Sequence, residues 1–180
     1  WHVLQADWAA AEQAYKQAIA VTPADPAGHI SLGRVYQARN EQKKALAQYE
    51  AGIAASPASP QAYVALGDWH QSQADWPAAE QAYKQAIAVA PADPGGYVHL
   101  ARAYQTYGRQ EEALAQYQAA VEMAPTSAAA AVALGDWYMS RGDWEGAQQA
   151  YQQAIAAAPG DPSGYLGLGQ VFQASGLQAE

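Results

Sequence analysis

The chain has 180 residues, of which 51% are hydrophobic and 14% charged, and its formal net charge is −8. This acidic balance argues against nucleic acid as a partner, because nucleic acid requires a basic stripe. Cysteine is absent, which excludes disulfides, thiolate metal sites and thiol nucleophiles, and no apolar run approaches the roughly 20 residues of a membrane-spanning helix.

Proline recurs with a 34-residue period along the whole chain, at Pro23, Pro57, Pro91, Pro125 and Pro159. A fixed period of this length indicates stacked copies of one supersecondary unit. Counting each repeat from the third residue after its proline predicts a single array over 1–180. It consists of a partial repeat at 1–25, complete repeats at 26–59, 60–93, 94–127 and 128–161, and a partial repeat at 162–180.

Each repeat is predicted to contain two helices. Positions four, seven, eight and eleven carry aromatic, leucine, small and aromatic residues, as in Tyr97, Leu100, Ala101 and Tyr104. Their i, i+3, i+4, i+7 spacing is typical of one face of an amphipathic helix. A second helix follows with small residues on either side of a tyrosine, Tyr117 in the same repeat. The small residues allow the two helices to approach closely, and the tyrosine fills the space between them.

The junctions between helices agree with this interpretation. Pro-Ala-Asp-Pro at 23–26 and 91–94, Pro-Ala-Ser-Pro at 57–60 and Pro-Gly-Asp-Pro at 159–162 join consecutive repeats. We expect the Asp or Ser to cap the following helix and the second proline to occupy its first turn. Within repeats, Gly108 and Gly142 mark the turn, and Asp75 and Asp143 are placed to cap the second helix.

These residues resemble the tetratricopeptide repeat family, whose 34-residue helix-turn-helix carries an aromatic, Leu-Gly, Tyr, Ala, aromatic, Ala, Pro pattern. The resemblance covers nearly the whole chain, with mild departures at His29, His70, Ala101 and Ala131. It implies an all-α, right-handed α-α superhelix. The lysines and asparagines with which chaperone-tail-binding members of the family clamp a carboxylate are absent, so that activity is not carried over.

A second, 68-residue period lies over the first. Residues 5–21 recur at 73–89 with only Ala9 changed to Pro77, which predicts a 68-residue double repeat. The six tryptophans follow it as the pairs Trp1 and Trp8, Trp69 and Trp76, Trp137 and Trp144. Core or inter-repeat packing is favoured for them over a platform that stacks sugars or bases.

No glycine-rich phosphate loop, nucleophile elbow or metal-ligand spacing appears, so we expect no enzyme activity, cofactor or metal. Positions two, six, nine and thirteen of the first helix lie opposite its apolar stripe, and the resemblance implies that this face lines a concave groove. Position nine alternates in sign through Arg34, Asp68, Arg102 and Asp136. Two interpretations are open: self-pairing that neutralises the groove, or recognition of a ligand of matching alternation. Further candidates are Gln37, Gln71, His99, Gln105 and Met139.

The pattern therefore predicts a non-enzymatic scaffold that binds an extended peptide or protein partner on its concave face. The alternative is a structural protein that self-assembles head to tail into a helical filament. Its contact surfaces would be two terminal stripes without a partner helix, Ala11, Tyr15 and Ala18 at one end and Tyr165, Leu168 and Phe172 at the other. An excerpt from a longer array would have both stripes covered by neighbouring repeats. An enzyme accessory domain is a third candidate, and the partner, the compartment and the full array length are left open.

Overall fold

The computed structural model describes residues 7–177, which form ten α-helices and no strand. The helices are α1 (Trp8–Val21), α2 (Pro26–Ala38), α3 (Gln42–Ala55), α4 (Pro60–Ser72), α5 (Trp76–Val89), α6 (Pro94–Thr106), α7 (Gln110–Met123), α8 (Ala128–Ser140), α9 (Trp144–Ala157) and α10 (Pro162–Leu177). The first helix of every complete repeat begins at the residue that the 34-residue register predicts. The all-α prediction is confirmed.

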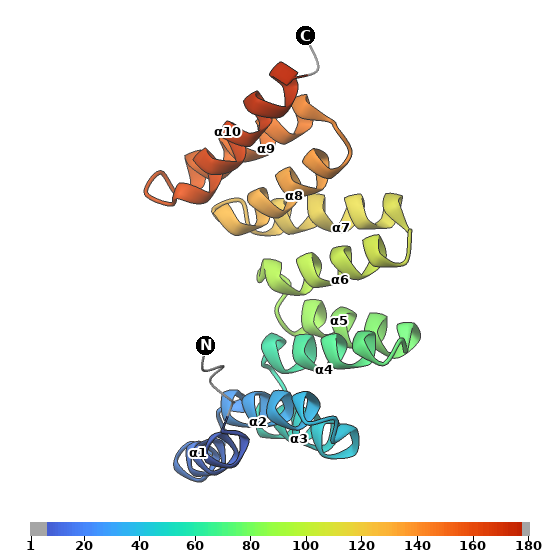
Figure 1. The fold of residues 1–180 in the computed structure, drawn as a ribbon, viewed down its shortest axis with the longest axis vertical. Coiled ribbons are helices and arrows are strands. Elements are labelled where there is room, and N and C mark those ends of the chain that lie inside the picture. Colours follow the sequence, from blue (N-terminus) through green and yellow to red (C-terminus); the bar gives the residue numbers. More distant parts are fainter. Residues whose placement is uncertain (1–6, 178–180) are drawn as a thin grey trace, which may run out of the picture. The chain divides into compact units, whose positions relative to one another are not determined.

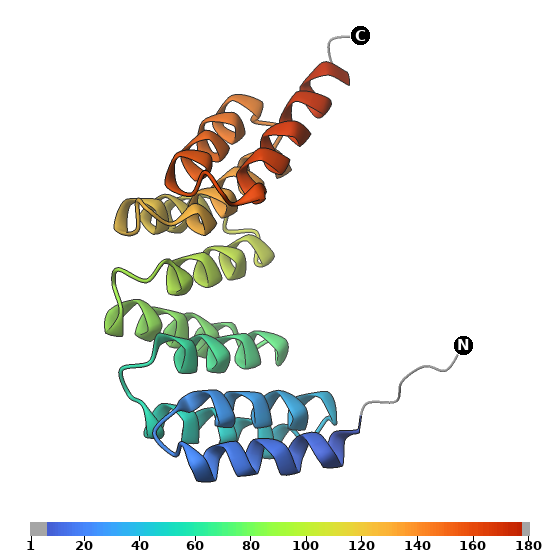
Figure 2. The ribbon, with the colours of Figure 1, turned by 90° about the vertical axis from the view of Figure 1, so that its left-hand side faces the viewer.

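The helices form two compact units, residues 1–90 and 91–180. In the N-terminal unit α1 packs on α2, and the hairpins α2–α3 and α4–α5 follow (Figure 1). In the C-terminal unit the hairpins α6–α7 and α8–α9 are followed by α10 (Figure 2). Within each unit, first helices of neighbouring repeats also contact one another, α2 with α4, α6 with α8, and α8 with α10.

Glycine–tyrosine contacts hold the helices of a hairpin close together. Gly135 of α8 faces Tyr151 of α9, and a Cβ atom built on the glycine would lie 2.6 Å from Cε1 of the buried tyrosine ring. The same arrangement joins Gly33 to Tyr49 and Gly67 to Tyr83. The predicted role of the small residues at position eight is confirmed, because a Cβ atom on any of these three glycines would overlap the ring as it now lies.

Most helix starts are capped as expected. Asp25, Asp93 and Asp161 accept hydrogen bonds of 2.8–2.9 Å from backbone N–H groups at the starts of α2, α6 and α10. Asp75 and Asp143 cap α5 and α9 in the same way. The prediction for Ser59 is wrong, since its side chain makes no capping bond to α4 and its hydroxyl donates instead to Gln61 Oε1 at 3.0 Å.

The turn inside each complete repeat uses a left-handed backbone at its fifteenth position. Gly108 and Gly142 have φ angles of 74° and 72°, as their type predicts. The same position holds Asn40 with φ 60° and Ala74 with φ 59°. Ala74 is therefore a strained residue, because a Cβ atom in this region costs roughly 1–2 kcal/mol.

We expect Ala74→Gly to raise the free energy of unfolding by about 0.5–1 kcal/mol, since relief of the strain exceeds the added entropy of the unfolded chain. Urea denaturation followed by circular dichroism measures the change. Gly108→Ala is the matched control, because nothing lies within 4 Å of a Cβ atom at that position and the substitution recreates only the backbone strain. An unchanged midpoint for both variants would contradict the strain.

The tryptophans divide by position. Trp69 and Trp137, at position ten, are each 8% exposed, so the packing prediction is confirmed for them. Trp76 and Trp144 are half-buried, whereas Trp8 is 41% exposed. Trp1 lies outside the described residues.

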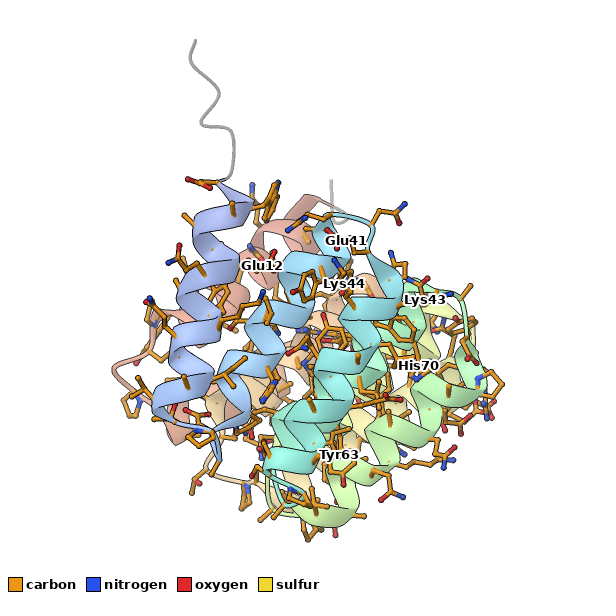
Figure 3. All side chains as sticks on the ribbon, turned by 90° about the horizontal axis from the view of Figure 1, so that it is seen from below. Glu12, Glu41, Lys43, Lys44, Tyr63 and His70 are labelled. Atoms are coloured by element: carbon orange, nitrogen blue, oxygen red, sulfur yellow. The ribbon has the colours of Figure 1, made fainter. Side chains whose placement is uncertain are left out.

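An ion-pair cluster ties α1 to α2 in the N-terminal unit. Glu12 accepts from Lys16 Nζ at 2.7 Å, from Arg39 Nη1 at 2.7 Å and from the Tyr36 hydroxyl at 3.0 Å. Arg39 also pairs with Glu41, which pairs with Lys44. Figure 3 labels Glu12, Glu41 and Lys44 within this cluster. These hydrogen bonds, led by that of Lys16, lower the pKa of Glu12 to about 2.

Because folding lowers this pKa from its ordinary 4.5, the Glu12 contribution to stability is fully present above about pH 4.5 and is lost as the pH falls towards 2. We expect the difference in unfolding free energy between the wild type and Glu12→Gln to shrink across this window. Denaturant titrations at several pH values measure it. Glu50→Gln is the control, since Glu50 is exposed and forms no ion pair within the described chain. A difference that does not vary with pH would contradict the role of Glu12.

Candidate functional site

The candidate residues lie on the first helices, on what is called below the first-helix face. In the N-terminal unit it comprises Arg34, Gln37, Asp68 and Gln71 on α2 and α4. In the C-terminal unit it comprises His99, Arg102, Gln105, Asp136 and Met139 on α6 and α8. Arg34, Arg102 and Asp136 are exposed, and the others are half-buried. Met139 packs partly against the core, around Tyr151.

Buried tyrosines of the second helices reach this face with their hydroxyl groups. In the N-terminal unit Tyr49 donates to Gln37 Oε1 at 2.9 Å, and the Tyr83 hydroxyl lies 2.8 Å from Asp68 Oδ1 and 2.9 Å from Gln71 Oε1. In the C-terminal unit Tyr117 donates to Gln105 Oε1 at 3.2 Å and Tyr151 to Asp136 Oδ1 at 2.7 Å. Each tyrosine ring belongs to the core, and its oxygen fixes a polar side chain on the face.

Sequence reasoning assigned these tyrosines to packing alone. The signal that would have revealed their second role is the residue type: the chain has 12 tyrosines and one phenylalanine. In each repeat the second helix has tyrosine at this position, namely Tyr15, Tyr49, Tyr83, Tyr117 and Tyr151. A core contact alone would accept phenylalanine, whereas a hydrogen bond to the surface requires the hydroxyl group.

The tyrosine hydroxyls remain protonated donors at neutral pH. Burial raises the pKa of Tyr49 to about 12, with the charge of Asp68 raising it further and that of Arg34 opposing. Burial and the hydrogen bond to Asp136 raise the pKa of Tyr151 in the same direction. The acceptors on the first-helix face therefore keep their donors throughout the physiological pH range.

The alternating charges on this face do not pair with one another inside either unit. In the part of the chain that the structure describes, neither Arg34 nor Arg102 forms an ion pair. The self-pairing interpretation is therefore wrong for Arg34 with Asp68 and for Arg102 with Asp136. Both guanidinium groups are exposed cations on the face.

Position six does not belong to the exposed face as predicted. Ala65 and Ala133 at this position are 4% and 5% exposed. The reason is the contact between neighbouring first helices, which turns position six towards the preceding repeat. Ala65 accordingly lies in the same core cluster as Tyr49. His99 occupies the same position and is half-buried.

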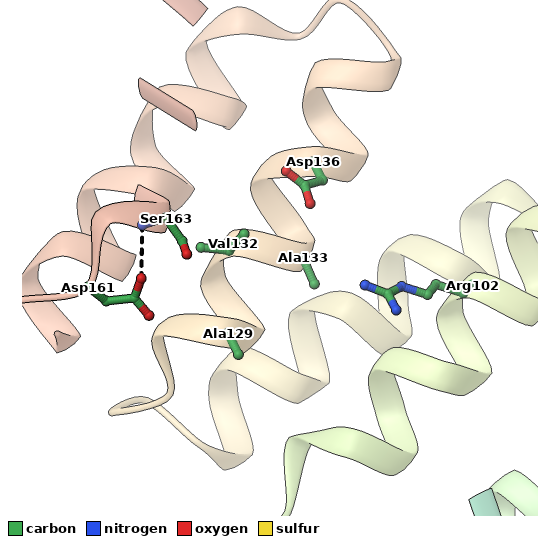
Figure 4. Close-up of a pocket in the computed structure, with 7 residues that line it drawn as sticks. All are labelled: Arg102, Ala129, Val132, Ala133, Asp136, Asp161 and Ser163. Carbon is green, nitrogen blue, oxygen red and sulfur yellow. Dashed lines mark hydrogen bonds between the residues drawn. The ribbon is translucent and has the colours of Figure 1, made fainter. Parts of the chain in front are cut away.

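A shallow cavity of about 230 Å³ lies on the first-helix face of the C-terminal unit (Figure 4). Arg102 of α6 and Asp136 of α8 line it together with Asp161 and Ser163 at the start of α10, above a floor of Ala129, Val132 and Ala133. The Ser163 N–H donates to Asp161 Oδ1 at 2.9 Å, and this backbone bond lowers the pKa of Asp161. The cavity thus presents one guanidinium and two carboxylates.

Residues 7–177 contain neither a metal-binding cluster nor a membrane-spanning helix. No group of three histidine, aspartate or glutamate side chains is arranged as ligands for a metal ion. None of the described helices combines the length and the apolar character needed to cross a membrane.

Helix hairpins that recur with a 34-residue period define a class of helical-repeat proteins. Family models described as "Tetratricopeptide repeat" match residues 3–60 and 61–128, and one described as "TPR repeat" matches residues 135–176. The chain belongs to the tetratricopeptide repeat family, whose members are in general non-catalytic scaffolds that bind protein partners.

Solved structures with the same fold are distant in sequence. A thermophilic TPR protein from Thermus thermophilus is 20% identical, with 92% of this chain and 91% of that chain covered and a TM-score of 0.70. MamA is 22% identical, with 84% and 88% covered and a TM-score of 0.58. A chain of the APC/C hetero-tetramer Cut9-Hcn1 is 16% identical, with 93% and 34% covered and a TM-score of 0.61. A comparison with curated proteins found no match.

Proposed function

We propose that the first-helix face binds an extended peptide segment of a protein partner, and that the protein acts as a non-enzymatic scaffold. The observation that carries this proposal is the row of buried tyrosines whose hydroxyls hold Gln37, Asp68, Gln105 and Asp136 in place. Side chains fixed before binding lose less conformational entropy when a ligand engages them. Within either unit, an extended peptide offers amide groups and side chains to the fixed side chains of two neighbouring first helices.

The charges on the face support a partner that is itself of mixed charge. Arg34 and Arg102 are cations without an ion pair in the described chain, and Asp136 and Asp161 line the same cavity as Arg102. A segment with an acidic residue next to a basic one would complement the cavity of the C-terminal unit. With a net charge of −8, long-range attraction favours the basic end of such a segment.

Selection of peptides from a random displayed library against the purified protein tests the proposal without knowledge of the natural partner. We expect the selected peptides to lose about tenfold or more in affinity for Arg102→Glu or Arg34→Glu, because the substitution places a carboxylate beside existing ones. Isothermal titration calorimetry measures the affinity, and circular dichroism confirms the fold.

Lys43→Glu is the matched control for charge reversal. Lys43 is exposed on α3, outside the first-helix face, and forms no ion pair within the described residues. Its substitution changes the net charge as Arg102→Glu does, so peptide affinity should stay within about threefold. Peptides that bind all three variants equally well would place recognition elsewhere on the protein.

A second candidate function, end-to-end self-association, is favoured by one specific observation. Gly169 of α10 occupies the position of Gly33, Gly67 and Gly135, yet no atom of the described residues lies within 4 Å of a Cβ atom built there. Tyr165 and Phe172 on the same stripe are 51% and 57% exposed, and Leu168 is half-buried. The stripe of α10 therefore has the glycine on which a tyrosine ring packs in the other repeats, but no tyrosine of the described residues packs there.

The complementary surface lies on α1. Ala11 and Tyr15 are half-buried and Ala18 is exposed, whereas Ala79, Tyr83 and Ala86, their counterparts two repeats later, are at most 1% exposed. In α5 the Tyr83 ring packs on Gly67 of α4. We propose that Tyr15 of a second copy packs on Gly169 in the same way, a heterologous contact that propagates into an open filament.

Light scattering and sedimentation of the 180-residue chain across concentration test this contact. We expect oligomers that grow with concentration and that Tyr15→Asp and Phe172→Asp abolish. Leu166→Asp is the control, because Leu166 is 65% exposed on α10 but lies off the stripe. A monodisperse monomer at millimolar concentration, or equal effects of Phe172→Asp and Leu166→Asp, would overturn the proposal.

A further inference from the structure

One buried donor in the C-terminal unit lacks an acceptor. Trp137 is 8% exposed, and its Nε1 atom has no hydrogen-bond partner among the described residues. A buried N–H without an acceptor is costly, so native structures rarely contain one without a reason. The position of this indole group is therefore a candidate binding site.

The N-terminal unit shows which chemistry satisfies the same group. Trp69, the equivalent tryptophan two repeats earlier, donates from Nε1 to the side-chain oxygen of Gln42 at 3.1 Å. Gln42 begins α3, and its counterpart Gln110 begins α7. Gln110 makes no such bond and instead lines a cavity together with Trp137. The chain itself thus identifies a carboxamide oxygen as the acceptor that fits this indole N–H.

The cavity has a volume of about 470 Å³ and lies between α7 and α8. Leu114 and Tyr138 form its apolar walls, and Glu111, Arg141 and Asp143 provide charged groups at its edge. The Arg141 guanidinium lies 5.2 Å from the centre of the Trp137 ring and forms no ion pair in the described chain. An indole group, a guanidinium group and two carboxylates therefore line one space.

We propose that this cavity is a second binding site, which accepts the carboxamide of a glutamine or asparagine side chain from a protein partner. The carboxamide oxygen accepts from Trp137 Nε1 and Arg141, and its NH₂ group donates to Glu111. Leu114 and Tyr138 pack on the methylene groups. Because the indole nitrogen is covered, a side chain of the cavity must move before the incoming group reaches it, and we expect Gln110, the counterpart of Gln42, to be that side chain.

The arrangement selects a carboxamide over related groups. A carboxylate supplies the acceptor and attracts Arg141, but two carboxylates of the cavity, Glu111 and Asp143, repel it and it lacks a donor for them. An ammonium group pairs with Glu111 and leaves the indole N–H without an acceptor. Of these three groups, only the carboxamide carries both an acceptor and a donor without a net charge.

Nuclear magnetic resonance of protein labelled with ¹⁵N-tryptophan tests the site. Trp137→Phe and Trp69→Phe assign the two indole resonances. N-acetylglutamine methylamide is then titrated, with N-acetylglutamate methylamide as the comparison. We expect a saturable shift of the Trp137 resonance and none of Trp69, with the glutamate derivative at least about threefold weaker. Glu111→Ala should remove the preference between the two probes.

Two results would overturn the proposal. The first is a Trp137 resonance that does not move at probe concentrations of about 100 mM, the range of very weak group binding. The second is a shift of this resonance on Gln110→Ala as large as that of Trp69 on Gln42→Ala, since Gln110 would then be the acceptor in solution. Neither result depends on peptide binding at the first-helix face.

Discussion

Replacement of Leu100 by alanine should lower the free energy of unfolding by about 2–5 kcal/mol, from lost burial and the cavity that remains. Leu100 is 1% exposed and occupies the seventh position of its repeat, where every complete repeat has leucine. Its methyl groups have no route to solvent, so the surrounding side chains must collapse around a void. Urea denaturation followed by circular dichroism measures the change.

Leu166→Ala is the matched control for this substitution. Leu166 lies on α10 and is 65% exposed, so the same chemical change should alter stability by no more than about 0.5 kcal/mol. Equal effects of the two substitutions would contradict the repeat register, because they would place residue 100 outside the core.

Gly135→Ala should destabilise the protein by about 1–2 kcal/mol, although alanine is the better helix former by about 1 kcal/mol. The added methyl group would meet the Tyr151 ring at 2.6 Å, and that ring is only 1% exposed and has no room to withdraw. Ala101 at the corresponding position of α6 shows that a hairpin of this chain can form around the methyl group, with the Tyr117 ring still buried at 3% exposed.

Gly169→Ala provides the opposite case at the same repeat position. With nothing within 4 Å of the new methyl group, only the helix preference acts, and stability should rise by up to about 1 kcal/mol. Thermal unfolding of dilute protein compares the two variants. A gain in stability for Gly135→Ala as well would show that Tyr151 does not lie on that glycine.

Helix positions were predictable from the sequence because they depend on local patterns that recur in every repeat. The starts at Pro26 and Pro94 follow from an Asp-Pro junction that both stops and caps. The left-handed Ala74 was not predictable, since alanine carries no signal for positive φ. There the repeat imposes a backbone on a residue that does not favour it. The 68-residue double repeat stays a prediction.

The candidate site was predictable only in part. The angular positions of Arg34 and Asp136 around their helix axes correctly predicted that both are exposed. Such a position depends only on the helix to which the residue belongs. The same reasoning failed for Ala65 and Ala133, whose burial depends on the neighbouring first helix. The missing acceptor of the buried Trp137 indole N–H was equally unpredictable from the sequence, since Gln42 and Gln110 are the same residue type with different contacts.

The tyrosines that join the core and the first-helix face would make the peptide recognition proposed above separable from folding over evolutionary time. A change of Tyr49 or Tyr151 to phenylalanine removes one oxygen and leaves the ring volume intact, so the helix hairpin still closes on its glycine. A single nucleotide substitution would thus remove the proposed binding role of one repeat while the array stays folded. Phenylalanine at this position would identify copies of the repeat that no longer bind a partner.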